Sequence, residues 1–491
     1  MSTSKATIRR LRTGVPGLDA ILGGGLPEYS FNLVAGPPGC GKTTLAHQIM
    51  FALATPQAPG LYFTILGEPP LKMLRYQQQF DFFDPEKVNQ SIHFVNLAEE
   101  TAGGDLDAVL ARIEQEVRLR SPAVVVVDSF RSVTLAAQGD SSDARLQRFI
   151  QQLGMLMTSW QATTFLIGEY FSEKDPNPVF TVSDGLIWMC QSAQRNSVVR
   201  KMEIMKMRGQ ATVAGLHTFR ITSAGIEVFA PSRAVAEPVP AISAPRPRLG
   251  TGIAALDEML GGGLPSGYSL LVAGPSGSGK SILATAFLAE GARHGEHGIV
   301  ASFEQGPRRS RDPRLSQLID AGSVSVIDTA VPDLSIEEAT ALLLAHVRER
   351  GTSRVVIDSL SSFELALAPS FREDFRESLA HMVSALAGTG ATVLMTSELE
   401  DRYTDLRFSP YGTAFLTDAI VVQRYVELQG ALERVMAVVK VRGSAHSNEL
   451  RLFHIDDEGI QVGACRPDHT GLLTGRPLRD AAAPDTASGS T

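Results

Sequence analysis

The sequence has little cysteine and no long apolar run. Its three cysteines, Cys40, Cys190 and Cys465, lie far apart and form no C-x-x-C pair. This argues against a disulfide framework and against a four-cysteine zinc site. A bilayer-spanning helix needs about 20 apolar residues, and the sequence has no such run. The opening residues, MSTSKATIRRLR, lack the apolar core of a signal peptide. We therefore expect a cytoplasmic protein without a membrane segment.

An excess of positive charge is also missing. The chain has 45 lysines and arginines against 53 aspartates and glutamates, and its net charge is −8. We therefore expect neither nucleic acid nor an anionic membrane as a partner. The apolar content of 44% is ordinary for a globular protein. A length of 491 residues favours two or more domains.

The main feature that is present is a long internal repeat. Residues 11–42 align without a gap on residues 249–280, with 19 identities in 32 positions and a constant offset of 238. Later segments recur in the same order, so that PAVVVVDSF is followed in the second half by SRVVIDSLSSF, and EIMKMRGQ by AVVKVRGS. A repeat of this length indicates a duplicated domain. We expect a first domain at 1–229, a linker rich in proline, alanine and serine at 230–248, a second domain at 249–465 and a largely disordered end at 466–491.

Each domain is predicted to belong to the α/β class. Short runs of β-branched and apolar residues, such as VVVVD and TTFLIG, alternate with longer helical segments, such as DARLQRFIQQLGMLMTSW. This alternation predicts a mostly parallel sheet that is flanked by helices on both faces.

Each domain also carries one loop of the pattern G-x-x-x-x-G-K-[ST], between an apolar strand and a helix. Glycines let successive backbone N–H groups turn toward one anion, and the following helix adds its positive amino end. We expect the lysine to bind the outer phosphates of ATP and the next hydroxyl to bind Mg²⁺. The predicted ATP-binding residues are Gly36, Gly39, Cys40, Gly41, Lys42, Thr43 and Thr44 in the first loop, and Gly274, Ser276, Gly277, Ser278, Gly279, Lys280, Ser281 and Ile282 in the second.

Two aspartates at strand ends are the other predicted parts of these sites. Asp128 ends the run VVVVD and Asp358 ends RVVID. A carboxylate in this position, after a phosphate loop, helps to hold Mg²⁺ in P-loop ATPases. An aspartate in an ordinary turn is the alternative. With the loop hydroxyls of Thr43 and Ser281, these aspartates form the predicted metal sites.

These motifs together resemble the KaiC branch of the RecA-type ATPases: TGVPGLDAILGGGLP, both phosphate loops, the VDS and IDS strand ends and the K-x-R-G segments. The resemblance implies two tandem RecA-like P-loop domains and a homo-hexamer of two rings, with ATP between neighbouring subunits. It also implies KaiB-like or other regulatory protein partners. Lys206 and Arg208 in the first ring, and Lys440 and Arg442 in the second, would then reach the ATP of the adjacent subunit. Solvated charges on an edge strand are the alternative.

The resemblance further implies a pair of adjacent glutamates, one of which orients the attacking nucleophile. This chain departs from the pair, because the first domain has LGEPP with Glu68 and the second has SFEQGP with Glu304. One carboxylate is enough to hold a water in line. Both glutamates are therefore predicted catalytic residues, and Glu304 is also a predicted metal ligand. Ordinary surface acids are the alternative, and if the first position of the pair is indispensable, only the second domain retains it.

In the second domain the resemblance adds Arg434 and His446 as nucleotide contacts, although a solvated loop histidine fits the second of them equally well. Some relatives phosphorylate a neighbouring serine and threonine in this domain. Those positions align with Ala414 and Phe415, and Thr413 and Thr417 are the nearby hydroxyls.

The predicted function is slow hydrolysis of MgATP at two subunit-interface sites per chain, by a ring-forming regulatory or timing ATPase. Two alternatives stay open. One is a serine/threonine autokinase and autophosphatase that acts through the second domain. The other is a recombinase-like DNA-binding ATPase, against which the negative net charge argues.

Overall fold

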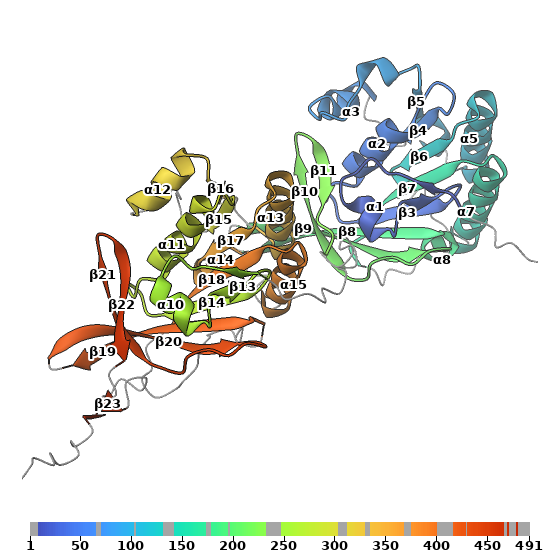
Figure 1. Cartoon of the computed structure of the whole chain (residues 1–491). Helices are drawn as coiled ribbons and strands as arrows, with labels where there is room; N and C mark the ends of the chain where they lie inside the picture. The colour runs from blue at the N-terminus through green and yellow to red at the C-terminus, as the bar shows by residue number, and fades with distance from the viewer. Residues whose placement is uncertain are drawn as a thin grey trace, which may run out of the picture. The chain divides into compact units, whose positions relative to one another are not determined.

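The computed structural model describes residues 8–64, 70–102, 105–130, 142–172, 178–194, 197–231, 247–302, 312–328, 334–367, 375–399, 416–428, 430–465, 469–470 and 478–479. The chain divides into two compact units, Met1–Val235 and Ala236–Thr491. Each unit contains its own large sheet with helices packed on it (Figure 1). The two units are described separately below.

The first unit is built on a nine-stranded sheet of order β11-β10-β9-β8-β3-β7-β6-β4-β5. The strands from β8 to β5 in this order pair in parallel, and β9, β10 and β11 extend the sheet in antiparallel fashion. The bounds are β3 (Phe31–Gly36), β4 (Gly60–Thr64), β5 (Ile92–Asn96), β6 (Val124–Asp128), β7 (Thr163–Glu169), β8 (Gly185–Gln194), β9 (Ser197–Met207), β10 (Leu216–Thr222) and β11 (Gly225–Val228).

Helices cover both faces of this sheet, which explains why its central strands are apolar along their length. One apolar cluster joins the sheet to α5 (Leu106–Arg120) and α7 (Ser142–Ser159). A second cluster joins the other face to α1 (Leu18–Ile21) and α2 (Lys42–Leu53). The shorter helices are α3 (Pro70–Gln77), α4 (Ala98–Ala102) and α8 (Pro178–Val182), and a 3-10 turn spans Pro85–Lys87.

The second unit repeats this topology strand for strand. Its nine-stranded sheet has the order β16-β15-β17-β18-β14-β19-β20-β21-β22. The bounds are β14 (Ser269–Gly274), β15 (Gly298–Ser302), β16 (Val324–Asp328), β17 (Arg354–Asp358), β18 (Thr392–Glu398), β19 (Ala419–Leu428), β20 (Ala431–Val441), β21 (Arg451–Asp456) and β22 (Gly459–Cys465). Its helices are α10 (Ala254–Met259), α11 (Lys280–Arg293), α12 (Pro313–Asp320), α13 (Ile336–Arg350), α14 (Leu360–Ala366) and α15 (Phe375–Gly388).

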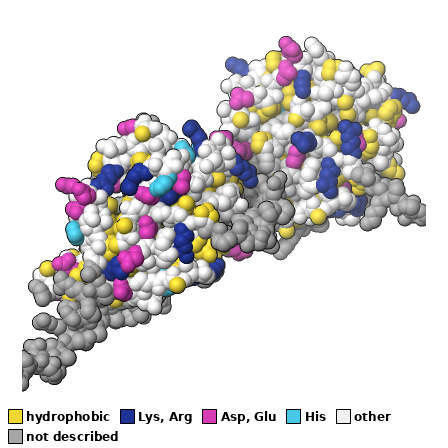
Figure 2. Space-filling model, viewed as in Figure 1, with side chains coloured by type: hydrophobic (Ala, Val, Ile, Leu, Met, Phe, Trp, Pro, Cys, Tyr) yellow, Lys and Arg dark blue, Asp and Glu magenta, His cyan; other side chains and the backbone are white. Residues whose placement is uncertain are grey.

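Short two-stranded sheets complete the architecture: β1 (Arg10–Leu11) with β2 (Leu26–Pro27), β12 (Arg248–Leu249) with β13 (Leu264–Pro265), and β23 (His469–Thr470) with β24 (Leu478–Arg479). The predicted fold class is confirmed, since both units are mostly parallel α/β sheets flanked by helices. On the face shown in Figure 2, basic and acidic side chains both occur on each unit, in keeping with the small net charge.

The two copies differ at the first residue of the equivalent strands β6 and β17, which is valine in the first unit and arginine in the second. Arg354, at the start of β17, is only 2% exposed. Its Nε donates to Glu296 Oε2 at 2.5 Å, and its Nη1 donates to the carbonyls of Gly250 and Phe287 at 2.7 and 2.9 Å. A Cβ at Gly291 would lie 2.5 Å from Arg354 Cδ, so helix α11 needs glycine where the arginine passes. The hydrogen bond to the Phe287 carbonyl ties α11 to the sheet, and the ion pair with Glu296 is partly buried.

Candidate nucleotide-binding sites

The first phosphate loop connects β3 to α2 and requires glycine for steric reasons. Gly36, Gly39 and Gly41 have φ values of 148°, 77° and 104°, a region that only glycine adopts readily. A Cβ at Gly36 would lie 1.8 Å from the Met189 carbonyl oxygen. In the second loop Gly277 and Gly279 have φ values of 76° and 104°. Both loops therefore have the curled backbone that the sequence pattern predicts.

Each loop lysine folds back onto its own loop. Lys42 Nζ donates to the carbonyls of Gly36 and Pro37 at 2.9 and 2.7 Å. Lys280 Nζ donates to Gly274 and Pro275 at the same two distances. Burial lowers the pKa of Lys280, while the charges of Glu398 and Asp358 act to raise it. The two lysines thus hold matching positions over their loops.

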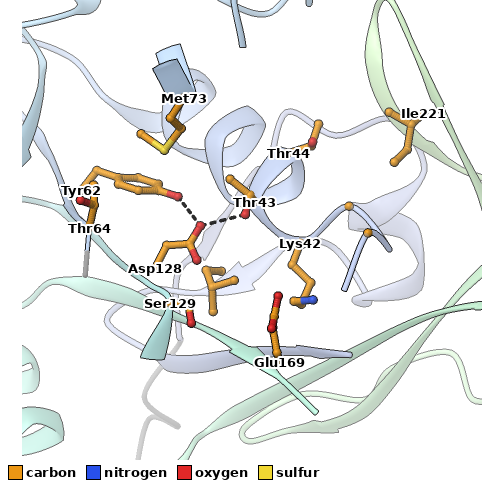
Figure 3. A pocket seen from close by; sticks show the side chains of 13 residues that line it. Lys42, Thr43, Thr44, Tyr62, Thr64, Met73, Asp128, Ser129, Glu169 and Ile221 are labelled. Carbon is orange, nitrogen blue, oxygen red and sulfur yellow. Dashed lines mark hydrogen bonds between the residues drawn. The ribbon is translucent and has the colours of Figure 1, made fainter. Parts of the chain in front are cut away.

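Thr43 and Asp128 meet, as the sequence predicts. Asp128 Oδ2 accepts a hydrogen bond from Thr43 Oγ1 at 2.8 Å and a second one from the Tyr62 hydroxyl at 2.6 Å (Figure 3). Burial raises the pKa of Asp128, and its hydrogen bonds with Tyr62 and Thr43 act against that rise. The hydroxyl and carboxylate oxygens are hard donors of the kind that Mg²⁺ prefers, together with the phosphates of a nucleotide.

A cavity of about 380 Å³ opens over this arrangement. Its lining comes from the phosphate loop, the ends of β4, β6 and β7, helix α3 and strand β10. The lining residues are Gly39, Gly41, Lys42, Thr43, Thr44, Tyr62, Thr64, Met73, Asp128, Ser129, Ile167, Glu169 and Ile221. Cys40 lies fully buried beneath the loop with its Sγ 3.7 Å from Lys42 Nζ, and burial raises the pKa of its thiol.

Sequence reasoning missed Tyr62 and Glu169. Glu169 had a usable signal, because ATTFLIGEY and ATVLMTSEL both end a strand in glutamate, in the same place in each copy. Tyr62 gave no signal, since it is one apolar-looking residue within GLYFT. Its equivalent in the second copy, at the offset of 238, is Val300.

In the second unit the corresponding aspartate is held differently. Asp358 accepts a hydrogen bond from the Thr396 hydroxyl. Beneath the loop, Ser278 Oγ donates to Gln423 Oε1 at 3.1 Å, where the first unit has Cys40 and Met189. The predicted residues Ser281 and Ile282 lie in the first turn of α11.

Arg434 reaches the second loop through a tyrosine. Its guanidinium carbon lies 5.4 Å from the centre of the Tyr425 ring, and the Tyr425 hydroxyl donates to the Ser276 carbonyl at 3.5 Å. His446 is half-buried, and its Nδ1 lies 3.0 Å from the carbonyl oxygen of Ser447.

In each sheet the K-x-R-G cations lie at one end of the central strands, and the phosphate loop of the same unit lies at the other end. Arg208 Nη1 lies 3.0 Å from Asp184 Oδ1, and Asp184 Oδ2 accepts from the Phe31 backbone N–H at the start of β3. The loop begins at Gly36, at the far end of that strand. Five residues of parallel strand span roughly 16 Å, which is beyond the reach of an arginine side chain.

Lys206 shares this location, because its Nζ donates to the carbonyls of Thr181 and Ser183 at 3.1 and 2.5 Å. Burial and the neighbouring Arg208 lower the pKa of Lys206. In the second unit Lys440 Nζ donates to the Thr417 carbonyl at 2.6 Å, and Arg442 Nη1 lies 3.3 Å from Asp418 Oδ1. Within one chain, none of these four cations is brought to the loop of its own unit.

The predicted residues Glu68 and Glu304 lie outside the described residues, as do Thr413 and the positions Ala414 and Phe415 that align with the phosphorylated pair of some relatives. Thr417 is described and is fully buried, so its hydroxyl is inaccessible in this conformation. No helix among the described residues has the length and apolar character needed to cross a membrane.

Behind the first site lies a buried histidine. His47, on α2, is 1% exposed, and neither of its ring nitrogens has a hydrogen-bond partner. Its ring packs edge-on against Tyr62 with the centroids 4.5 Å apart. Burial lowers its pKa from 6.5 to about 3. The folded first unit therefore keeps this ring neutral.

This histidine should make the first unit sensitive to acid. Between pH 6.5 and 3 the unfolded chain binds a proton at His47 that the folded chain does not, so stability falls as the pH falls. From pH 7 to pH 5 the expected loss is about 2 kcal/mol. His47→Thr, which copies Thr285 of the second unit, should remove this slope. Both tryptophans, Trp160 and Trp188, lie in the first unit, so urea unfolding followed by tryptophan fluorescence at several pH values measures the stability of this unit. The same dependence of stability on pH in the wild type and in His47→Thr would contradict the prediction.

Comparison with known proteins identifies the family. A family model described as "ATPase: KaiC" matches residues 11–233 and again residues 249–466. The chain is 27% identical over 487 residues to the circadian clock oscillator protein KaiC of Rippkaea orientalis, covering 96% of this chain and 92% of that protein. It is also 27% identical over 497 residues to the circadian clock protein KaiC3 of a Synechocystis species, covering 96% and 95% of the two chains. Because the family model covers most of the chain in two copies, the chain belongs to the KaiC family of ATPases and carries two of the family's domains in tandem.

Proposed function

We propose that this chain binds MgATP at two sites and hydrolyses it slowly as a ring-forming regulatory or timing ATPase. The observation that carries the proposal is the pair of matching phosphate loops, each with its lysine over the loop and an aspartate at the end of the next strand but one in the sheet. The circadian names of the relatives support a regulatory role, since a timing protein acts through its own conformation and its partners. KaiB-like proteins are the proposed class of partner.

The residues of each site have separate proposed roles. Lys42 and Lys280 would leave the loop carbonyls to bind the outer phosphates, and the loop N–H groups would bind the remaining oxygens. Thr43 with Asp128, and Ser281 with Asp358, would hold Mg²⁺, which when bound neutralises charge on the phosphates. Glu68 and Glu304 are proposed to orient the attacking water, and Glu304 to hold the metal as well. Arg434 and His446 are proposed as further nucleotide contacts in the second unit.

The proposed assembly is a homo-hexamer in which each ATP lies between two subunits. What supports it is the location of the K-x-R-G cations, at the sheet edge opposite the loop of their own unit. A cation in that place serves a nucleotide only if another subunit brings it there. Lys206 and Arg208, and Lys440 and Arg442, would then stabilise charge on the terminal phosphate of the neighbour's ATP.

Lys42→Ala and Lys280→Ala, made separately, test the two sites. Each should weaken ATP binding at its own site by roughly 10- to 150-fold, because a hydrogen bond to a charged group contributes about 1.5–3 kcal/mol. The other site should keep its affinity. Calorimetric titration with a non-hydrolysable ATP analogue and Mg²⁺ measures both, and native mass reports assembly. A wild-type chain that is monomeric and takes up no MgATP would contradict the proposed function.

A further inference from the structure

Each site contains a second carboxylate, between the phosphate loop and the aspartate proposed to hold Mg²⁺ (Asp128 or Asp358, called the metal-side aspartate below). In the first sheet β7 lies between β3 and β6. Glu169 ends β7 and pairs in register with Gly36, where the phosphate loop begins. In the second sheet Glu398 ends β18 and pairs with Gly274. The two copies therefore present a glutamate at the same point of the same sheet edge.

The backbone around each glutamate is fixed to the phosphate loop. The Gly36 carbonyl accepts hydrogen bonds from Lys42 Nζ at 2.9 Å and from the Tyr170 N–H at 3.2 Å. In the second unit the Gly274 carbonyl accepts from Lys280 Nζ at 2.9 Å and from the Leu399 N–H at 3.0 Å. The residue after each glutamate thus shares a carbonyl with the loop lysine, which places the glutamate beside that lysine.

The side chain of Glu169 lines the cavity together with Lys42, Thr43 and Asp128, and Figure 3 shows it pointing into the cavity from the strand end. Its charge acts on Asp128, as that of Glu398 acts on Lys280. Asp128 is already engaged by the hydroxyls of Thr43 and Tyr62. Glu169 therefore adds a second carboxylate to the cavity lining, beside the loop lysine.

This position suits a role other than metal binding, which is the proposed role of the metal-side aspartate. A carboxylate close to the terminal phosphate is repelled by it, but it can accept a hydrogen bond from a water that lies between them. We propose that Glu169 and Glu398 contact the water that attacks the terminal phosphate of ATP. This inference rests on the proposed function and adds a catalytic residue to each site.

The step balances as ordinary hydrolysis. The oxygen of the water forms a bond to the γ-phosphorus while the bond from the γ-phosphorus to the β,γ-bridging oxygen breaks, and that electron pair stays on ADP. The glutamate carboxylate takes up the proton that the water loses and releases it to solvent afterwards. Products are ADP, phosphate and one proton.

Glu169→Gln in a Lys280→Ala background, and Glu398→Gln in a Lys42→Ala background, test the inference one site at a time. General base catalysis contributes at least about 100-fold, so the single-turnover rate of ATP cleavage should fall at least that far. Equilibrium binding of ATP should stay within about threefold, since glutamine keeps the size and polarity of the side chain. The acid limb of the pH–rate profile should disappear in each variant. Glu114→Gln and Glu349→Gln replace exposed helical glutamates of the two units and serve as matched controls.

Two results would overturn the inference. One is a cleavage rate within a few fold of the unsubstituted background, whether or not Glu68→Gln and Glu304→Gln abolish cleavage. The other is a loss of ATP affinity as large as the loss of rate, which would assign these glutamates to lysine placement instead of catalysis. A wild-type chain that does not bind ATP gives a different result, because it overturns the proposed function before any glutamate is changed.

Discussion

Arg208→Ala and Arg442→Ala should each lower ATP hydrolysis at the corresponding ring of the proposed hexamer by about 1,000-fold, the smaller end of the range for an arginine supplied to a terminal phosphate from another subunit. Arg208 is 59% exposed beside Asp184, so its side chain can leave that partner when a neighbouring subunit approaches. ATP affinity should change much less than the rate, because the arginine acts mainly on charge that develops during the reaction. Steady-state phosphate release, with the other ring inactivated at its loop lysine, measures the effect.

A mixing experiment separates action on the neighbour's ATP from action within one chain. Arg208→Ala chains keep an intact loop, and Lys42→Ala chains keep an intact arginine. In rings formed from an equal mixture, roughly a quarter of the interfaces combine the two intact halves, as head-to-tail contacts require. Activity should therefore recover to about that fraction. Arg118→Ala, which removes an exposed arginine from α5, should leave the rate unchanged; a mixture that stays inactive would contradict an arginine shared between subunits.

Arg354→Val should destabilise the second unit by about 3 kcal/mol, the low end of the range for breaking a buried ion pair, because the Glu296 side chain is 25% exposed. The substitution leaves Glu296 without its guanidinium, and it removes the donors that the Gly250 and Phe287 carbonyls use. Far-UV circular dichroism during urea unfolding should show the transition of the second unit at lower urea. The tryptophan fluorescence transition should stay where it is, since both tryptophans belong to the first unit.

The double variant Arg354→Val/Glu296→Ala is the matched control. It copies Val124 and Ala58, the residues that the first unit has at these positions. Because an apolar replacement of both partners is often nearly neutral, it should regain at least half of the lost stability. A double variant as unstable as the single one would show that the unpaired glutamate is not the cause.

The parts of the molecule that sequence reasoning found are local in the chain. The glycines, Lys42 and Thr43 lie within one loop, and Asp128 ends an apolar run, so each could be recognised from a few adjacent residues. The strand and helix alternation was equally local, and it predicted the fold class correctly.

The parts that sequence reasoning missed depend on strand register. Glu169 is placed beside the loop because β7 pairs with β3 across more than a hundred residues, and Tyr62 reaches Asp128 because β4 pairs with β6. His47 occupies a helix position that looks like any polar site until the strands behind it are in place. Likewise, the K-x-R-G motif alone did not show where its cations lie; the hydrogen bond from the Phe31 N–H to Asp184, which pairs with Arg208, places Arg208 at the end of β3 away from the phosphate loop.

The close approach of Arg354 to Gly291 limits the order in which the two halves could diverge. The first half has Leu53 and Val124 at the equivalent positions. A leucine at 291 would collide with the arginine, since even a Cβ there lies 2.5 Å from its Cδ. The arginine could therefore enter only while the helix position was glycine, and it must be lost before a larger residue can occupy that position. Substitutions at these two sites are coupled, and a consensus built by averaging the halves would join incompatible residues.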